Sequence, residues 1–250
     1  MILRPRNPLP ASTTDFVPAW DAVLRTQKQT ATECQLVAQA DHAALAGEIA
    51  GNIDSPDFPK LDPEIIQAIA VHDDGWKQID GRPKKSGRPL SFFEEAPADI
   101  FQAWKGSIAR ATLVAPIAGI LVSEHFCRIA RDFSRATTTT PEIAQVLTTF
   151  LERENVQQEE LREQQARDAA EINLLVDVLQ FFDLLSLYVC CGSLENIELP
   201  QRFNQKLFRL HRDSDKYRLE PSLFNRPITF SIETTDYPSK SEEQISILLI

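Results

Sequence analysis

The chain has 250 residues, of which 43% are hydrophobic and 25% are charged, so it is long enough to bury a sizeable core. Its 26 basic and 36 acidic residues give a formal net charge of −10 at pH 7. A surface with this charge repels nucleic acids and anionic lipids, which argues against either as a partner.

Cysteine spacing and hydropathy predict a cytoplasmic protein. The N-terminal residues 1–16 contain no apolar core of a secretory signal. The richest apolar stretch, 174–191, is interrupted by polar residues and falls short of a membrane span. No CxxC pair occurs, which argues against a disulfide framework or a zinc finger. The cysteines are Cys34, Cys127, Cys190 and Cys191.

The first hundred residues are predicted to be helical between irregular segments. Residues 1–30 begin with a proline-rich stretch and are expected to form an N-terminal extension. Apolar residues at helical spacing predict a helix over 30–50. Asp62–Pro63 is a typical helix start, and the helix is expected to cover 63–74 and to end near Gly75. The density of glycine and proline after that point predicts an irregular loop.

Helices are also predicted for most of the following hundred residues. Residues 100–133 have helical character, with Pro116 dividing or kinking the helix. Residues 142–191 contain neither glycine nor proline, which predicts one long helix or two helices divided near 154–155. Gly192 is expected to supply the C-terminal stop.

The C-terminal segment has a different character. Short runs of β-branched and aromatic residues at 217–219, 228–233 and 245–250 predict strands separated by turns. We therefore expect a mainly α protein, in which a helical domain at 31–192 is followed by a short β-containing extension at 193–250 that packs on it.

Three of the four histidines lie in apolar helical surroundings: His42, His72 and His125. A single histidine in such a place is most often a hydrogen-bonded core residue. His72 and Asp73, however, point inward together, and Asp183 has a leucine one turn away on either side. Burying these carboxylates without a partner costs several kcal/mol. A metal ion would compensate the negative charge of both.

The order His42, His72-Asp73, Asp183 on predicted helices resembles the H…HD…D signature of the HD superfamily of phosphohydrolases. More closely, four segments resemble a bacterial HD-related family that is described only as a domain of unknown function; they are Gln39–Gly47, His72–Trp76, Gly87–Phe92 and Leu121–Phe126. The resemblance covers roughly residues 33–192. It implies an HD-like helical bundle with His42, His72, Asp73 and Asp183 as metal ligands.

By that resemblance, the function is metal-dependent hydrolysis of a phosphate ester by a metal-activated water. The expected cofactor is a divalent transition metal, Mn, Fe, Ni or Zn. One ion is the simplest expectation, and Asp73 would bridge two if a second were bound. Asp74 or His125 would relay the proton. Three other roles of His125 stay open: it would bind a second ion, support the ligands of the first, or be a core histidine bonded to a carbonyl.

A loop at 77–88 predicts how the substrate is held. Many HD hydrolases have a lysine where this chain has Trp76, and Lys77 comes one place later. The loop carries five positive charges in an otherwise acidic chain. Arg82 and Arg88, each beside a proline, are the better candidates for fixed contacts, and Trp76 would wall the pocket. We therefore expect a small anionic substrate between the metal and this loop.

Two other classes of function stay open. The same scaffold supports di-iron oxygenases when additional histidines hold a second iron, but this chain has only His125 to spare. A ligand-binding or regulatory protein that keeps the metal for structure is the third possibility. No phosphate-cradling glycine loop and no GxSxG motif occurs. The sequence is compatible with a homo-oligomer.

Overall fold

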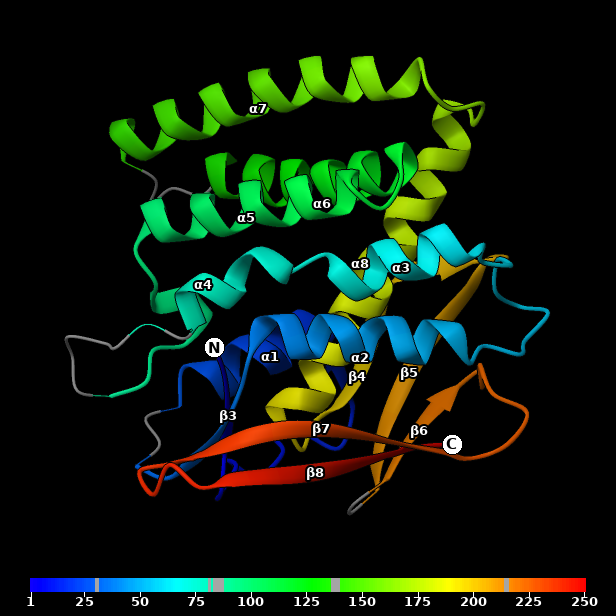
Figure 1. Ribbon diagram of the computed structural model, residues 1–250. Coiled ribbons are helices and arrows are strands. Elements are labelled where there is room, and N and C mark those ends of the chain that lie inside the picture. Colours follow the sequence, from blue (N-terminus) through cyan, green and yellow to red (C-terminus); the bar gives the residue numbers. More distant parts are fainter. Residues whose placement is uncertain (30–31, 81, 83–87, 136–139, 214–215) are drawn as a thin grey trace.

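Eight strands form one mixed, curled sheet, a half-barrel that makes one side of the molecule (Figure 1). The computed structural model describes residues 1–29, 32–80, 82, 88–135, 140–213 and 216–250. The strands are β1 (Ile2–Pro5), β2 (Phe16–Pro18), β3 (Cys34–Val37), β4 (Asn196–Phe203), β5 (Lys206–Asp213), β6 (Lys216–Glu220), β7 (Ile228–Tyr237) and β8 (Glu242–Leu249). Their order is β1-β3-β7-β8-β6-β5-β4-β2, and only the β2–β4 and β6–β8 pairs are parallel.

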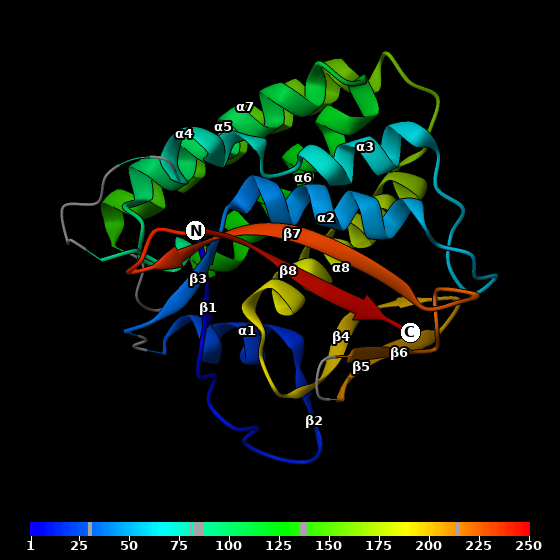
Figure 2. The ribbon, with the colours of Figure 1, turned by 60° about the horizontal axis from the view of Figure 1, so that its bottom comes forward.

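Helices stack in layers on this sheet. They are α1 (Ala19–Gln27), α2 (Gln39–Gly51), α3 (Pro63–Val71), α4 (Lys77–Asp80), α5 (Pro97–Thr112), α6 (Pro116–Arg135), α7 (Pro141–Arg162) and α8 (Ala169–Cys191), with 3₁₀ turns η1 (Asp74–Trp76) and η2 (Phe92–Glu94). α2 contacts β7, as Figure 2 shows, and α3 packs on α2. α5 and α6 form the next layer, and α7 lies outermost (Figure 1).

α8 crosses the layers and forms the centre of the core. It contacts α1, α2, α3, α6, β1 and β4. The Asp168 carboxylate caps its N-terminus by accepting from Glu171 N, and Gly192 ends it in the left-handed region at φ 67°. By length and composition α8 could cross a membrane, but 78% of its apolar window is buried within the fold. Its hydrophobicity therefore fits a core helix.

Several element boundaries follow the sequence signals. Pro116 separates α5 from α6, and Gly192 terminates α8, so both predictions are confirmed. The break in the long helical region lies at 163–168 and not at 154–155, because Asp168 provides the cap that starts α8. The predicted helix over 30–50 is shorter, since its first part contains strand β3.

The expectation of a mainly α protein, an HD-like helical bundle with a small β tail, was wrong. Helices hold 52% of the chain and strands 21%, and the strands build one sheet, so the fold is α/β. The prediction missed β1 and β3 because each is only four residues long. Through β1, β2 and β3, the segments 1–30, 31–192 and 193–250 share this one sheet.

Candidate metal centre

Four helices bring together the histidines and aspartates singled out in the sequence. His42 lies one turn into α2, and His72 follows the last residue of α3, with Asp73 next to it. His125 lies in α6 and Asp183 in α8. Among these helices, α3 packs against α2, α6 and α8, and α8 also contacts α2 and α6. The cluster is therefore assembled by the helix packing itself.

The side-chain atoms converge to distances that suit one metal ion. The Nε2 atom of His42 lies 3.1 Å from Oδ2 of Asp73, and Nε2 of His72 lies 3.2 Å from Oδ1 of Asp183. His72 Nε2 is also 3.9 Å from Asp73 Oδ2. Ligands that bind one transition metal at about 2.1 Å lie within about 4.2 Å of one another. Within the described residues, His42, His72 and Asp73 therefore form one group that could hold an ion.

In His42 and His72, the hydrogen bond at Nδ1 determines which ring nitrogen binds a metal. Nδ1 of His72 lies 2.7 Å from the carbonyl of Ile69, which can only accept. Nδ1 of His42 lies 2.9 Å from Ser186 Oγ, whose own proton goes to the carbonyl of Asp183 at 2.9 Å. Ser186 must therefore accept from His42 as well. Both Nδ1 atoms carry a proton, so Nε2 is the nitrogen that each ring offers to a metal, as in metal-binding histidines with an anchored far nitrogen.

Both Nε2 atoms face carboxylates, so the cluster needs a positive charge between them. Burial by itself lowers the pKa of His72, but Asp73 and Asp183 outweigh it and raise the pKa to about 9. Burial opposes ionisation of Asp183, yet the hydrogen bond from His72 and the nearby imidazoles hold its pKa at about 2. A proton on His72 supplies the charge in the metal-free protein. A divalent cation can take the same place.

His125 stands beside this group. Its Nε2 lies 3.8 Å from Oδ2 of Asp183, and its Nδ1 is buried without a hydrogen-bond partner among the described residues. Burial, together with the nearby His72, lowers the pKa of His125 to about 4, although Asp183 opposes the shift. The imidazole is therefore neutral at pH 7 and can accept a proton. It also lines the pocket described below.

A second possible ligand group consists of His72, His125 and Asp183. It shares His72 with the first group. Because Nδ1 of His72 is bonded to Ile69, this ring has one nitrogen left for a metal. Because both groups need this one nitrogen of His72, they do not provide separate ligand sets for two ions.

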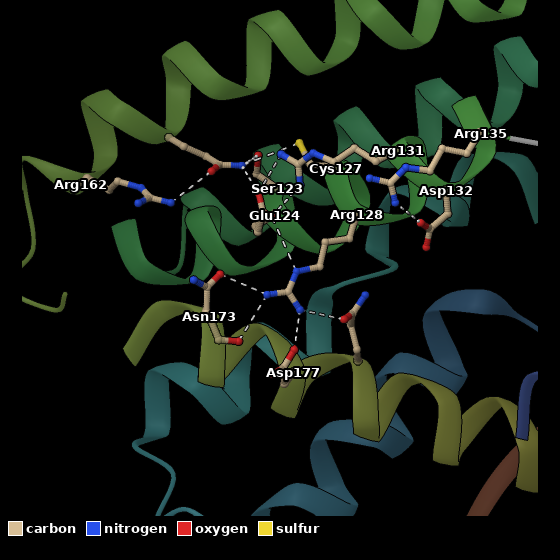
Figure 3. A network of polar contacts seen from close by, with 12 residues as sticks. Ser123, Glu124, Cys127, Arg128, Arg131, Asp132, Arg135, Arg162, Asn173 and Asp177 are labelled. Atoms are coloured by element: carbon tan, nitrogen blue, oxygen red, sulfur yellow. Dashed lines mark hydrogen bonds and ion pairs between the residues drawn. The ribbon is translucent and has the colours of Figure 1, made fainter. Parts of the chain in front are cut away.

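A polar network holds α6 against its neighbours (Figure 3). Arg128, three residues after His125, reaches Asp177 at 2.5 Å and Gln180 at 3.0 Å on α8. On the other side of α6, Ser123 donates to Glu154 of α7 at 2.9 Å. These contacts fix the helix that carries His125 relative to the helix that carries Asp183.

Arg82 and Arg88, the two described arginines of the predicted basic loop, do not reach the cluster, which removes the support for an arginine-held substrate. Arg82 is bonded to Asp99 at 2.7 Å and Arg88 to Glu94 at 2.6 Å, both at the surface. Neither arginine lines the pocket beside the cluster. The reason is that surface carboxylates bind both guanidinium groups. Lys84 and Lys85 lie outside the described residues.

Asp74 and Lys77 also point away from the cluster. Their side chains pair with each other at 2.8 Å, and Asp74 has Arg110 at 3.4 Å on its other oxygen. Neither residue lines the pocket. This geometry gives no support to Asp74 as a proton relay or to Lys77 as a substrate contact. Their ion pairs occupy the outer face of η1, whereas Trp76 faces inward.

An apolar pocket of about 340 Å³ opens onto the cluster. Asp73, His125 and Asp183 line it at the cluster, and Trp76 forms part of its wall. Trp104 and Gln39, to which the sequence analysis gave no role, also line the pocket.

Gln39 and Ser186 could have been found by helical spacing. Gln39 precedes His42 by three residues, and Ser186 follows Asp183 by three, so each lies on the same helix face as a candidate ligand.

Comparisons with known proteins provide a family but no activity. A family model described as "Protein of unknown function (DUF3891)" matches residues 26–238. Neither the curated proteins nor the solved structures contain a match. The resemblance to the HD superfamily was wrong, because the matching family is a different one and the half-barrel is not an HD helical bundle. The labels HD domain and hydrolase lose the support that the resemblance gave them. Any metal chemistry must now be argued from the cluster itself.

Proposed function

The chain belongs to the DUF3891 family, whose function is unknown, and from its own side chains we propose that it is a metal-dependent hydrolase. One observation carries the proposal: two imidazoles with anchored Nδ1 atoms direct their Nε2 atoms at two carboxylates. Imidazole and carboxylate donors in this combination suit Mn, Fe, Ni and Zn. No relative contributes to the argument.

The residues divide into ligands and a proton acceptor. His42, His72, Asp73 and Asp183 hold the ion, and the carboxylates of Asp73 and Asp183 face the pocket. A bound divalent ion lowers the pKa of a coordinated water and polarises the bond under attack. His125 lines the pocket and lies 3.8 Å from Asp183, and from this position we assign it the role of accepting the proton of that water; its lowered pKa makes it a weak base in the metal-free protein. Hydrolysis adds water across an ester bond and releases an acid and an alcohol.

Phosphate esters are the first substrates to test, because a phosphoryl oxygen is a good ligand for such an ion. An iron oxygenase with two ions is less favoured, since the second ligand group reuses His72. A protein that binds metal and ligand without turnover has the same cluster. Only measured turnover separates that function from a hydrolase.

The first experiment measures metal content. Wild-type protein, untreated and after incubation with Mn, Fe, Ni or Zn, is analysed by inductively coupled plasma mass spectrometry. We expect about one ion per chain in the wild type and none in Asp183→Asn. Glu171→Gln, on the same helix but paired with Arg167 at the surface, is the control and should keep the ion. Absence of metal from the reconstituted wild type would contradict the proposal.

The second experiment measures turnover by the metal-loaded protein. Release of 4-nitrophenolate from bis(4-nitrophenyl) phosphate and from 4-nitrophenyl phosphate is followed by absorbance, with oxygen consumption recorded in parallel. Hydrolysis that is lost in His125→Gln, while metal content is retained, supports the assigned role of His125. Oxygen consumption with iron and no hydrolysis would replace the hydrolase by an oxygenase. No turnover of either kind would leave a binding protein.

A further inference from the structure

The pocket that opens onto the metal cluster has a chemistry of its own. Aromatic and aliphatic side chains form most of its wall, among them Trp76, Phe92, Trp104, Phe126 and Leu187. We propose that it binds a flat, apolar body of aromatic size, carrying at most one negative charge and a hydrogen-bond donor directed at Gln39. If the proposed function holds, this body is part of the substrate, and the bond to be hydrolysed lies at Asp73 and Asp183. The binding itself does not depend on the metal.

The charge of the wall excludes a compact polyanion. The carboxylates of Asp73 and Asp183 line the pocket, and among the residues that the structure describes no lysine or arginine does. These two carboxylates would already balance the charge of a divalent ion. A dianion entering the pocket would therefore find no net positive charge to compensate it.

The aromatic wall favours a flat guest. Trp104 stacks on Phe126 with ring centroids 5.2 Å apart and an interplanar angle of 20°. Phe92 and Phe93 lie against each other at 4.0 Å, and Trp20, at the rim, packs edge-on against Phe93. Such faces gain most from a ring that can stack or meet them edge to face. The volume of about 340 Å³ is in the range of pockets that enclose small molecules.

Gln39 supplies the polar feature that a ligand must match. It is 2% exposed, lines the pocket, and its Oε1 is buried with no hydrogen-bond partner among the described residues. Its backbone N–H is used by Asp80 at 2.7 Å, so the helix start is satisfied without the side chain. A buried carbonyl oxygen left unpaired is unfavourable. A ligand O–H or N–H that reaches this oxygen removes that penalty.

Three probes that share one naphthalene ring system distinguish the effects of the ring, the hydrogen bond to Gln39 and the charge. 1-Naphthol is neutral and carries one O–H donor, 1-methoxynaphthalene lacks the donor, and 1-naphthyl phosphate is a dianion at pH 7.5. Binding to metal-free protein is measured by isothermal titration calorimetry. All three tryptophans, Trp20, Trp76 and Trp104, line the pocket, so intrinsic fluorescence gives an independent signal of occupancy.

Variants test the location and the hydrogen bond. Ile129→Trp fills the pocket from α6, and Ile66→Trp, outside this pocket, is its control. Gln39→Met keeps the side-chain length but removes the acceptor. We expect it to weaken 1-naphthol about two- to tenfold, the value of one hydrogen bond, and to leave 1-methoxynaphthalene unchanged. A merely structural role of Gln39 would change both probes equally.

The probe-binding results test the pocket independently of the metal-content results. The inference is supported if 1-naphthol binds more tightly than 1-naphthyl phosphate and Ile129→Trp abolishes its binding. It is overturned if the dianion binds to metal-free protein as well as 1-naphthol, or if binding persists in Ile129→Trp. If the protein holds no metal yet binds 1-naphthol, the proposed function fails and the pocket assignment stands. If it holds metal and no probe binds, the pocket assignment fails and the proposed function stands.

Discussion

At the scale of single residues, the two metal-facing histidines differ in how they are anchored. His72 is held by the carbonyl of Ile69, a main-chain group of its own helix that no substitution removes. His42 is held by the hydroxyl of Ser186 on a different helix. Ser186 does two things at once, because it accepts from His42 and donates to the carbonyl of Asp183. It therefore connects two ligands without contacting the ion.

Ser186→Ala should weaken metal binding and leave the fold intact. Without the hydroxyl, the Nδ1 proton of His42 is no longer fixed, and loss of such a supporting contact typically lowers metal affinity about 10- to 100-fold. Competition with a chromophoric chelator measures the dissociation constant. Ser193→Ala, a buried serine beyond the end of α8, is the control and should bind metal normally. Equal affinities in the two variants would show that Ser186 does not position His42.

At the scale of secondary-structure elements, a close contact sets the distance between α2 and α3, which carry His42 and His72. A Cβ atom placed on Gly47 would lie 2.4 Å from Cβ and 2.8 Å from Cα of Ala70. Gly51, at the end of the same helix, has nothing nearer than Ile66 at 3.7 Å. The helices therefore touch at Gly47, one turn beyond His42.

Gly47→Ala should lower both stability and metal affinity. The added methyl group has to displace the backbone of α3, and such overpacking costs about 1–3 kcal/mol. The same displacement moves His42 away from His72. Gly51→Ala should be neutral or more stable by about 0.4–1 kcal/mol, because it reduces only the entropy of the unfolded chain. Urea unfolding of both variants, with chelator titration of the metal, compares them. Similar losses in the two would exclude the close contact as the cause.

A second contact between elements, that of α6 with α7, depends on a buried carboxyl group. Glu154 is buried and accepts from Ser123, and Gln158 donates to the same serine at 2.9 Å. Burial raises the pKa of Glu154 above 4.5, although the bond from Ser123 opposes the shift. The folded protein thus binds this proton more tightly than the unfolded chain does. The resulting stabilisation is complete below pH 4.5 and is lost as pH rises through the folded pKa.

Two substitutions separate charge from hydrogen bonding at this contact. Glu154→Gln keeps an oxygen that accepts from Ser123 but removes the buried charge. It should therefore raise the free energy of unfolding, relative to the wild type, by more at pH 7 than at pH 4. Ser123→Ala leaves Glu154 and Gln158 without their shared partner and should cost about 1–3 kcal/mol. Urea unfolding at both pH values measures these effects. A Glu154→Gln variant with the wild-type pH dependence would contradict the assigned pKa shift.

At the scale of the whole molecule, the sheet joins the two ends of the chain. β1 pairs with β3, which pairs with β7, and β2 pairs with β4. One connected core extends from Ile2 to Leu249. The four cysteines, Cys34, Cys127, Cys190 and Cys191, are all buried. They therefore report on the integrity of the whole fold.

The native protein should not react with Ellman's reagent, and all four thiols should react after unfolding. Burial raises the pKa of Cys127 and of Cys191 to about 12, so the reactive thiolate is scarce even where the reagent has access. Absorbance of the released thionitrobenzoate is followed with and without guanidinium chloride. Reaction of one or two thiols in the absence of denaturant would show that part of the core opens independently.

The sequence by itself determined the features that depend on neighbouring residues. Pro116 and Gly192 mark helix boundaries, and the apolar spacing around Asp183 marks a carboxylate that faces inward, because both signals act within one or two turns of a helix. The tertiary structure decided what joins distant segments. Arg6 donates a hydrogen bond to Asp236 although 230 residues separate them. No local pattern in β1 or β3 identifies a partner strand so far away in the chain. That is why the sheet, and with it the fold class, was missed.

The same distinction applies to the site. Each of the candidates His42, His72, Asp73, His125 and Asp183 could be proposed from its own surroundings, but their separation of 3.1 to 3.9 Å exists only once four helices pack. The sequence predicted an anionic substrate from a local excess of positive charge. Folding pairs Arg82 and Arg88 with carboxylates and places aromatic rings around the cluster instead. Charge counted along a chain does not show which charges remain free, because ion pairs form between side chains that meet in space.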